Sequence, residues 1–180
     1  MNKDKARVVI YSANEAFKKL MFIAKNIDDN TRDELELNIK KDALTIAGHI
    51  SYEILYPLFN EYSEIKNEIM IIDKGLALST TEEKKCEKGD IFNDKNKTRI
   101  ITYIATSAFS KLGGSLVPHV VSIGKEDDSN KSKQELEATQ AIIEQSGEII
   151  LKILKPIFKK YPEFEEEINL IHNEFGILPC

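Results

Sequence analysis

A histidine and a glutamate at helical spacing are the first residues in this sequence whose types could do chemistry. His49 and Glu53 are four residues apart, so on a helix both would face the same way, as metal ligands in a helical bundle must. In a second, similar segment the matched residues are Glu148 and Lys152, and a lysine opposes a bound cation. His49 and Glu53 are therefore candidate metal ligands, and the alternative is a surface or half-buried histidine with no metal.

A glycine pair marks a second candidate site. Gly113 and Gly114 are followed by Ser115 and then by an apolar run that holds Pro118 and His119. Backbone N–H groups of such a loop can bind a phosphate. The chain lacks the GxxxxGK[ST] pattern of a phosphate-binding loop, and the alternative is a hinge or helix break, because glycine disfavours helix. We take these five residues as a candidate partner or ligand segment.

The remaining reactive residue types form no recognisable set. No Ser–His–acid or Cys–His combination has a specific spacing, so we predict no catalytic residue and no cofactor. The two cysteines, Cys86 and Cys180, are not part of a CxxC pair, which gives no zinc or redox signature. They are expected to be free thiols in a reducing cytoplasm, and the alternative is a disulfide between them.

These residues depend on helices for their placement. Apolar residues recur every three or four positions over residues 4–27, from 32 to at least 56, and again over 133–161, as on amphipathic helices. Asp4 is the expected N-cap of the first helix, and Thr31 with Glu34 has the spacing of a capping box. Ser132 and Glu135 repeat that spacing before the last long helix.

Two blocks of the sequence occur twice. Residues 54–69 and 153–168 are identical at eight of sixteen positions, and residues 7–20 and 99–112 are identical at seven of fourteen. This predicts an internal duplication. Residues 113–124 lie in the extra material of the second copy, so the candidate segment is the apolar stretch that the duplication does not explain.

The duplication leads to a fold prediction. One hairpin buries only one side of each helix, so two hairpins are expected to share a core. We predict an all-α fold in which duplicated hairpins form a four-long-helix bundle with pseudo-twofold symmetry. The expected divisions are repeat 1 at residues 1–78, a charged connector at 79–98 and repeat 2 at 99–180, within one structural domain.

Each repeat contains a proline that disturbs its second helix. Pro57 and Pro156 lack an N–H, and their rings clash with the carbonyl four residues earlier. We expect each second helix to be kinked or broken at its proline and followed by a shorter helix. The first of these shorter helices is expected to end near residues 73–75, with Gly75 just beyond its last turn.

Several residues that occur in both copies have a predicted structural role. Arg7 and Arg99 are expected to form ion pairs with glutamates on the shorter helices, at positions 64 and 68 and at 163 and 167. Tyr62 and Tyr161 are expected to bury their rings and satisfy their hydroxyls at the surface. Small residues at matched positions are expected to let helix axes approach closely: Ala13, Ala16, Ala105, Ala108, Gly48 and Gly147.

Composition restricts the function classes. The net charge is −5 and basic residues are dispersed, which argues against nucleic-acid binding. The hydrophobic fraction is 42%, but no apolar run approaches the ~20 residues that span a bilayer, and we expect no signal peptide. We predict a cytoplasmic, non-enzymatic protein-interaction or regulatory bundle, monomeric or homodimeric, with an unknown protein partner. The alternative is a bundle that binds a small ligand or metal, with or without hydrolytic activity.

Overall fold

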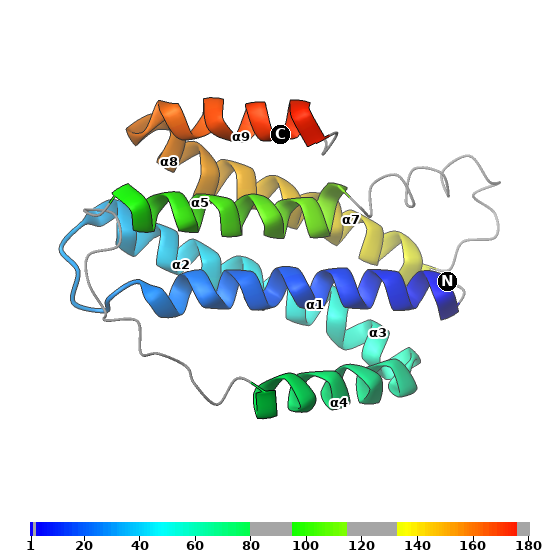
Figure 1. Cartoon of the computed structure of the whole chain (residues 1–180). Coiled ribbons are helices and arrows are strands. Elements are labelled where there is room, and N and C mark those ends of the chain that lie inside the picture. The colour runs from blue at the N-terminus through cyan, green and yellow to red at the C-terminus, as the bar shows by residue number, and fades with distance from the viewer. Residues whose placement is uncertain (2, 80–94, 115–132, 176–180) are drawn as a thin grey trace.

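The structure, a computed structural model, describes residues 1, 3–79, 95–114 and 133–175, and every secondary-structure element within these ranges is helical (Figure 1). The predicted all-α class is confirmed. The elements, in chain order, are α1 (Lys3–Asn26), α2 (Glu34–His49), the π-helix η1 (Ile50–Leu55), α3 (Tyr56–Glu61), α4 (Ser63–Ser79), α5 (Lys95–Phe109), the π-helix η2 (Ser110–Gly114), α7 (Lys133–Glu148), the π-helix η4 (Ile149–Leu154), α8 (Lys155–Lys160) and α9 (Pro162–Phe175).

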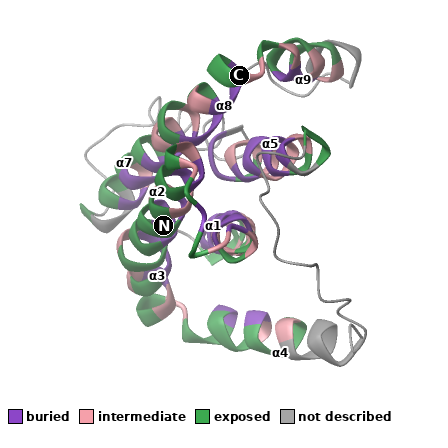
Figure 2. Ribbon diagram, turned by 90° about the vertical axis from the view of Figure 1, so that its left-hand side faces the viewer, coloured by how far each residue is buried: buried purple, intermediate pink, exposed green. Residues whose placement is uncertain are grey.

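The long helices pack in two layers. α1 and α5 run side by side in opposite directions, and behind them α2 with α3 lies beside α7 with α8, also antiparallel (Figures 1 and 2). Buried aliphatic residues from all these helices, such as Ile10, Ile46 and Ile153, form one core cluster. α4 and α9 lie at opposite edges, α4 against α1 and α9 against α5.

The helix starts differ from the predicted caps. Asp4 is inside the first turn of α1, because this helix begins at Lys3. The predicted capping box of Thr31 and Glu34 is wrong by two residues, since Asp33 is the N-cap of α2 and accepts a hydrogen bond from Leu35 N–H at 2.9 Å. Ser132, from the second predicted capping box, lies outside the described residues.

The prolines widen the helices and do not end them. A π-turn precedes Pro57, in which the N–H of Tyr56 donates to the carbonyl of Ser51 five residues earlier. In the other long helix, Lys155 N–H donates to Ile150 in the same way, just before Pro156. Proline cannot use the carbonyl four residues back and its ring crowds it. In the π-turn, the residue before the proline donates its N–H to the carbonyl five residues earlier instead of four. The helix then continues for six residues as α3 or α8.

The helices break five residues after each proline. Tyr62 has φ −122° and ψ 64°, and Tyr161 has φ −135° and ψ 75°. Each tyrosine still donates its N–H to the preceding turn, Tyr62 to Leu58 and Tyr161 to Ile157, both at 2.8 Å. The chain therefore turns within one residue into α4 or α9.

The predicted arginine–glutamate ion pairs form, and they attach α4 to α1 and α9 to α5. Arg7 donates two hydrogen bonds to Glu68, from Nη2 at 3.0 Å and from Nε at 3.2 Å. Arg99 Nε lies 3.1 Å from Glu167. A lysine pair accompanies each arginine, Lys3–Glu64 at 2.9 Å and Lys95–Glu163 at 2.7 Å.

The tyrosines at the breaks are half-buried as whole residues, and the burial of their rings stays a prediction. The Tyr62 hydroxyl donates to the Met1 carbonyl. The Tyr161 ring stacks on Phe164, with 5.3 Å between centroids.

The small residues at matched positions fall into two groups. Ala13, Ala16, Ala105 and Ala108 are buried, which agrees with their predicted role in helix packing. The packing explanation for Gly48 and Gly147 is wrong, because a Cβ on either would meet no atom within 4 Å. Gly113 is instead the close-packed glycine, since its Cβ would lie 2.9 Å from the Ser146 Oγ.

Two element boundaries lie outside their predicted ranges. α4 continues past Gly75 to Ser79, so this glycine does not end the helix. α5 begins at Lys95, inside the predicted 79–98 connector. Residues 80–94 of that connector, including Cys86, and Cys180 at the other end of the chain lie outside the described ranges, so the alternatives for the two thiols stay predictions.

Candidate functional site

The candidate metal pair lies on the outside of the molecule. His49 ends α2 and Glu53 is in η1, and their Nδ1 and Oε1 atoms are 2.7 Å apart. The second oxygen of Glu53 accepts a hydrogen bond from Gln145 at 3.4 Å. His49 and Glu53 therefore form a local polar pair whose carboxylate also contacts α7.

The surroundings of this pair add no further ligand. Across the described ranges, no group of three or more His, Cys, Asp or Glu side chains is arranged to hold a metal ion. The matched positions in the other long helix, Glu148 and Lys152, form an ion pair with each other. Hydrogen bonding by Glu148 is the largest cause that raises the pKa of Lys152, which keeps this ammonium charged.

The glycine segment is described only in part. Gly113 and Gly114 end the π-helix η2 that continues α5, so the predicted disturbance takes the form of a widened turn. Gly113 is buried against Ser146 and Phe109, which gives it a packing role. Ser115, Pro118 and His119 lie outside the described residues, and the partner or ligand role of the segment stays a prediction.

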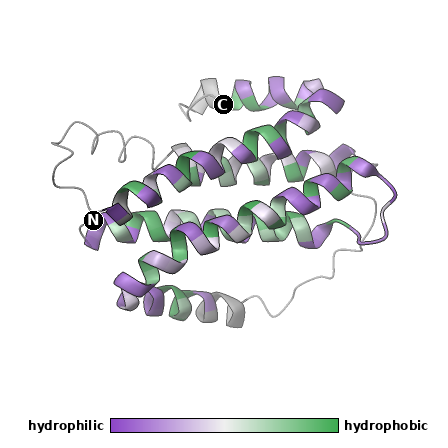
Figure 3. Ribbon diagram, turned by 180° about the vertical axis from the view of Figure 1, so that it is seen from behind, coloured by the Kyte–Doolittle hydropathy of each residue, from purple (hydrophilic) through white to green (hydrophobic). Residues whose placement is uncertain are grey.

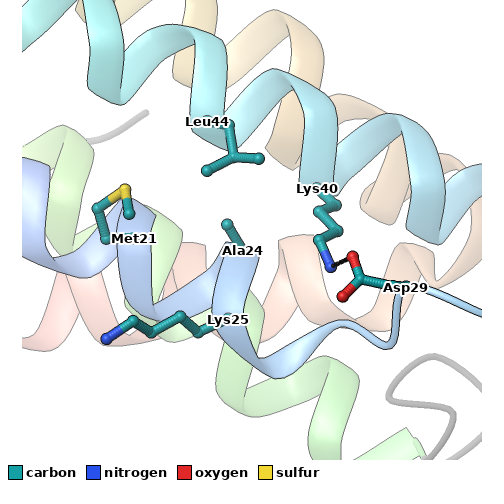
Figure 4. Close-up of a pocket in the computed structure, with 6 residues that line it drawn as sticks. All are labelled: Met21, Ala24, Lys25, Asp29, Lys40 and Leu44. Atoms are coloured by element: carbon teal, nitrogen blue, oxygen red, sulfur yellow. Dashed lines mark hydrogen bonds and ion pairs between the residues drawn. The ribbon is translucent and has the colours of Figure 1, made fainter.

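A groove of about 300 Å³ lies between α1 and α2 (Figure 4). It is lined by Met21, Ala24, Lys25, Asp29, Lys40 and Leu44. The Lys40 ammonium donates to the Ile27 carbonyl at 2.8 Å and to the Asp29 carboxylate. The most buried cation of the groove is thus bound by the loop after α1, and its role is to hold that loop against α2.

Polar side chains also line the inner side of α5, a feature that the sequence reasoning missed. Thr98, Thr102 and Thr106 are buried at four-residue spacing. Thr102 donates to the Thr98 carbonyl at 2.9 Å, and on α7 Ser146 donates to the Ile142 carbonyl at 2.6 Å. The spacing of the threonines was a visible signal. The hydroxyls of Thr102 and Ser146 therefore bond within their own helices, while the buried Thr106 Oγ1 has no hydrogen-bond partner among the described residues.

An exposed apolar surface was missed as well. Six large apolar side chains are exposed on the helices of the layer formed by α2–α3 and α7–α8, which is in front in Figure 3, and one of them, Leu44, also lines the groove beside α1. We call this set of residues the outer face; its members are Leu37, Leu44, Tyr52, Leu136, Ile143 and Leu151, each between 41% and 76% exposed.

The six residues of the outer face occupy matched sequence positions in the two helices. Leu37 matches Leu136, Leu44 matches Ile143, and Tyr52 matches Leu151, always ninety-nine residues apart. Gly48 and Gly147 match at the same offset and lie between these residues in sequence. This repetition of exposed apolar types was readable from the sequence, but helical periodicity draws attention to the buried face first.

Comparison of the chain with protein-family models, with curated proteins and with solved structures finds no significant match. Among the helices within the described ranges, none combines the length and the apolar character that crossing a membrane requires.

Proposed function

We propose that the protein is a non-enzymatic interaction protein that binds another protein through its outer face. The observation that carries this proposal is the set of six exposed apolar side chains at matched positions on two neighbouring helices. Single exposed apolar residues are ordinary, but several gathered on one side mark an interaction surface.

The interior supports the same proposal. The core cluster consists of aliphatic, alanine and phenylalanine side chains contributed by both halves of the chain. A ligand-binding bundle is expected to carry convergent polar groups in such a position. Among the buried polar groups, the hydroxyls of Thr102 and Ser146 bond to their own helices. The alternative, a bundle that binds a small ligand or metal and is hydrolytic, has no specific observation in its favour.

We further propose that the chain is a four-long-helix bundle formed by two duplicated hairpins related by pseudo-twofold symmetry. Its support is the recurrence of local structure at matched positions. Both second helices have a π-turn before a proline and a break at a tyrosine, and both outer helices are fastened by an arginine and a lysine. A duplication brings two copies of each surface residue onto one molecule.

Capture of partners from an extract of the native host tests the interaction proposal. The outer-face variant carries Tyr52→Lys and Leu151→Lys, and the control variant carries Ile71→Lys and Leu170→Lys, which are similarly exposed on α4 and α9. We expect the wild type and the control to retain a protein, identified by mass spectrometry, that the outer-face variant loses. Equal recovery by all three baits would contradict the proposal.

A further inference from the structure

We infer that α4 is a hinged strap, a helix that leaves α1 by rotation about Tyr62 while the remaining helices stay folded, and that its ion pairs make this release sensitive to ionic strength. The inference concerns a movement within the chain and is independent of the proposed interaction partner. Three features carry it: the joint at Tyr62, the uneven burial of α4, and the exposed charges that attach this helix to α1.

The joint between α3 and α4 is a single residue. Tyr62 has φ −122° and ψ 64°, and α4 begins directly after it at Ser63. The Tyr62 N–H donates to the Leu58 carbonyl in α3 at 2.8 Å, and the Tyr62 carbonyl accepts from the Ile65 N–H in α4 at 3.0 Å. Rotation about the Tyr62 dihedral angles moves its carbonyl with α4 and leaves its N–H with α3, so both hydrogen bonds survive the movement. Hinges of this kind let a whole element swing about one or a few residues.

The apolar face of α4 is covered at its beginning and open toward its end. Ile65, Ile69 and Ile72 lie on one side of the helix, because they are four and three residues apart. Ile65 is 0% exposed and Ile69 is 5% exposed, but Ile72 is 45% exposed. On α9 the matched residue Ile171 is half-buried. The apolar contact of α4 therefore depends on its first two turns, which limits the burial that opposes its release.

The other contacts between α4 and α1 are pairs of charged side chains. α4 runs beside α1 in the same direction (Figure 1). Three ion pairs join the two helices: Lys3–Glu64, Arg7–Glu68 and Lys18–Asp73. All six side chains are between 36% and 51% exposed. Exposed ion pairs contribute little each and are screened by salt, since the Debye length falls from about 10 Å at 0.1 M to about 3 Å at 1 M ionic strength.

α9 is the matched comparison, because it has the same joint and a different attachment. Tyr161 has φ −135° and ψ 75°, close to the values of Tyr62. The Arg99 guanidinium lies over the ring of the buried Phe164, and the Tyr103 hydroxyl donates to Glu167. Salt does not weaken the burial of an aromatic ring as it weakens an exposed ion pair. Salt should therefore release α4 more readily than α9.

Release changes the surface that the protein presents to water. Ile65 and Ile69 belong to the core cluster, and both become exposed when α4 leaves α1. They then add to Met70 and Ile71, which are exposed already. The exposure of these buried side chains opposes release, so the released form is a minor population in dilute salt. Ionic strength thus sets how much apolar surface the chain exposes at this edge.

Single-molecule energy transfer between two dyes tests the inference on the full chain, with both native cysteines replaced by serine. The strap pair of labels uses Asn67→Cys on α4 with Gln140→Cys on α7. The control pair uses the matched positions, Glu166→Cys on α9 with Lys41→Cys on α2, and all four residues are exposed. We expect the strap pair to show a second distance, with a share below about 10% at 0.1 M potassium chloride and at least about threefold larger at 1 M. The control pair should keep one distance.

Removal of two ion pairs gives a second test with a control of equal charge. Lys3→Gln with Lys18→Gln should raise the share of the second distance at 0.1 M salt to about its wild-type value at 1 M, and should leave little further dependence on salt. The control, Lys19→Gln with Lys25→Gln, removes two charges from α1 that form no ion pair within the described ranges. It should behave as the wild type, and an equal rise in this control would show that the ion pairs do not hold α4.

Two further results would overturn the inference. One is a single distance for the strap pair at both salt concentrations, in the wild type and in the Lys3→Gln/Lys18→Gln variant. The other is a second distance that grows equally in the control pair, or that grows together with a loss of helical content by circular dichroism. The bundle would then open as a whole, and α4 would not move as a strap.

Discussion

α4 and α9 are each attached by an arginine at a matched position, Arg7 for α4 and Arg99 for α9. The residues that surround the two arginines differ. At α4, Arg7 makes a two-bonded pair with Glu68, and the buried residue beside this region is Ile65. At α9, Phe164 takes the position of Ile65, and the Arg99 guanidinium lies over its ring at 5.4 Å. One attachment is mainly polar, and the other combines charge with aromatic packing.

A tyrosine hydroxyl extends the second attachment. Tyr103 donates a hydrogen bond to Glu167 at 2.7 Å, so this carboxylate interacts with two residues of α5. Burial and then the hydrogen bond to Glu167 raise the pKa of Tyr103, which keeps the proton on its hydroxyl. The comparison teaches that the same ion pair can be embedded in different local packing, and that the α9 attachment is expected to resist disruption better.

The largest expected effect is on the buried residue of each attachment. Phe164→Ala should destabilise the chain by about 3–5 kcal/mol, and Ile65→Ala by about 2–5 kcal/mol, because each leaves a cavity where a fully buried side chain was. Chemical denaturation measures both. If Ile65→Ala proves the more costly of the two, the stronger attachment is at α4 and the comparison is reversed.

Charge reversal at the arginines is expected to have the next largest effect. Arg99→Glu should cost about 1–2 kcal/mol, because it puts two acids together and removes the contact with Phe164. Arg7→Glu should lower the melting temperature by repulsion from Glu68.

Exchanging the two charges of each ion pair tests how much of each attachment depends on charge alone. Arg7→Glu with Glu68→Arg should restore most of the loss at α4, where the arginine interacts mainly through charge. Arg99→Glu with Glu167→Arg should restore less, because the ring contact and the Tyr103 bond depend on the original positions. Equal restoration at both attachments would show that the aromatic surroundings contribute nothing.

Removal of one hydroxyl is a smaller change. Tyr103→Phe should cost about 1 kcal/mol, the net value of a hydrogen bond to a partly buried group. The matched residue in α1 is Tyr11, and Tyr11→Phe is the control, for which we expect almost no change. Thermal unfolding of both variants checks the difference, and an equal loss would argue against the Tyr103–Glu167 bond.

Acid is expected to affect the two attachments unequally, with the smallest effect. Hydrogen bonds from Lys3, Arg7 and Lys95 are the largest causes that lower the pKa values of Glu64, Glu68 and Glu163 respectively. A carboxyl with a lowered folded-state pKa adds stability above its unfolded pKa, near 4.5, and loses it as the pH falls through the folded value. The melting temperature should therefore fall as the pH drops below that region.

Glutamine variants locate this acid sensitivity. Glu64→Gln with Glu68→Gln should remove more of the pH dependence than Glu163→Gln, because two of the three shifted groups are on α4. Melting curves between neutral and acidic pH compare the variants. A larger change for Glu163→Gln would place the main acid-sensitive contact at α9.

The sequence predicted the helices and the ion pairs well because both depend on local spacing and on repetition. Arg7 and Glu68 are far apart in the chain, yet the second occurrence of the same types identified them as partners. The prediction failed where tertiary geometry decides. Gly48 has the sequence context of a packing glycine, but the sequence position alone does not say which side of its helix faces the core.

The π-turns show the same limit. Proline chemistry predicts a disturbance at Pro57, but it does not say whether the helix bends, ends or widens. The sequence held one clue to the π-turn. Ile50, Ile54 and Leu58 repeat every four residues and are all buried. On a regular α-helix of about 3.6 residues per turn, positions four apart move progressively around the helix and do not stay on one face. The outer face was missed for a simpler reason, because exposed apolar residues are common and have no periodic signal of their own.

The one-residue breaks at Tyr62 and Tyr161 have a consequence for hydrogen exchange. Among residues whose burial is described, α4 buries Ile65 and Ile69, while α9 buries Phe164 and Ile168. Helices with few buried contacts open at a lower free energy than the rest of a domain. Their amide protons should therefore exchange with deuterium before those of α1 and α5, and α4 should exchange before α9. The protein then has two opposite edges that open and close while its centre stays folded.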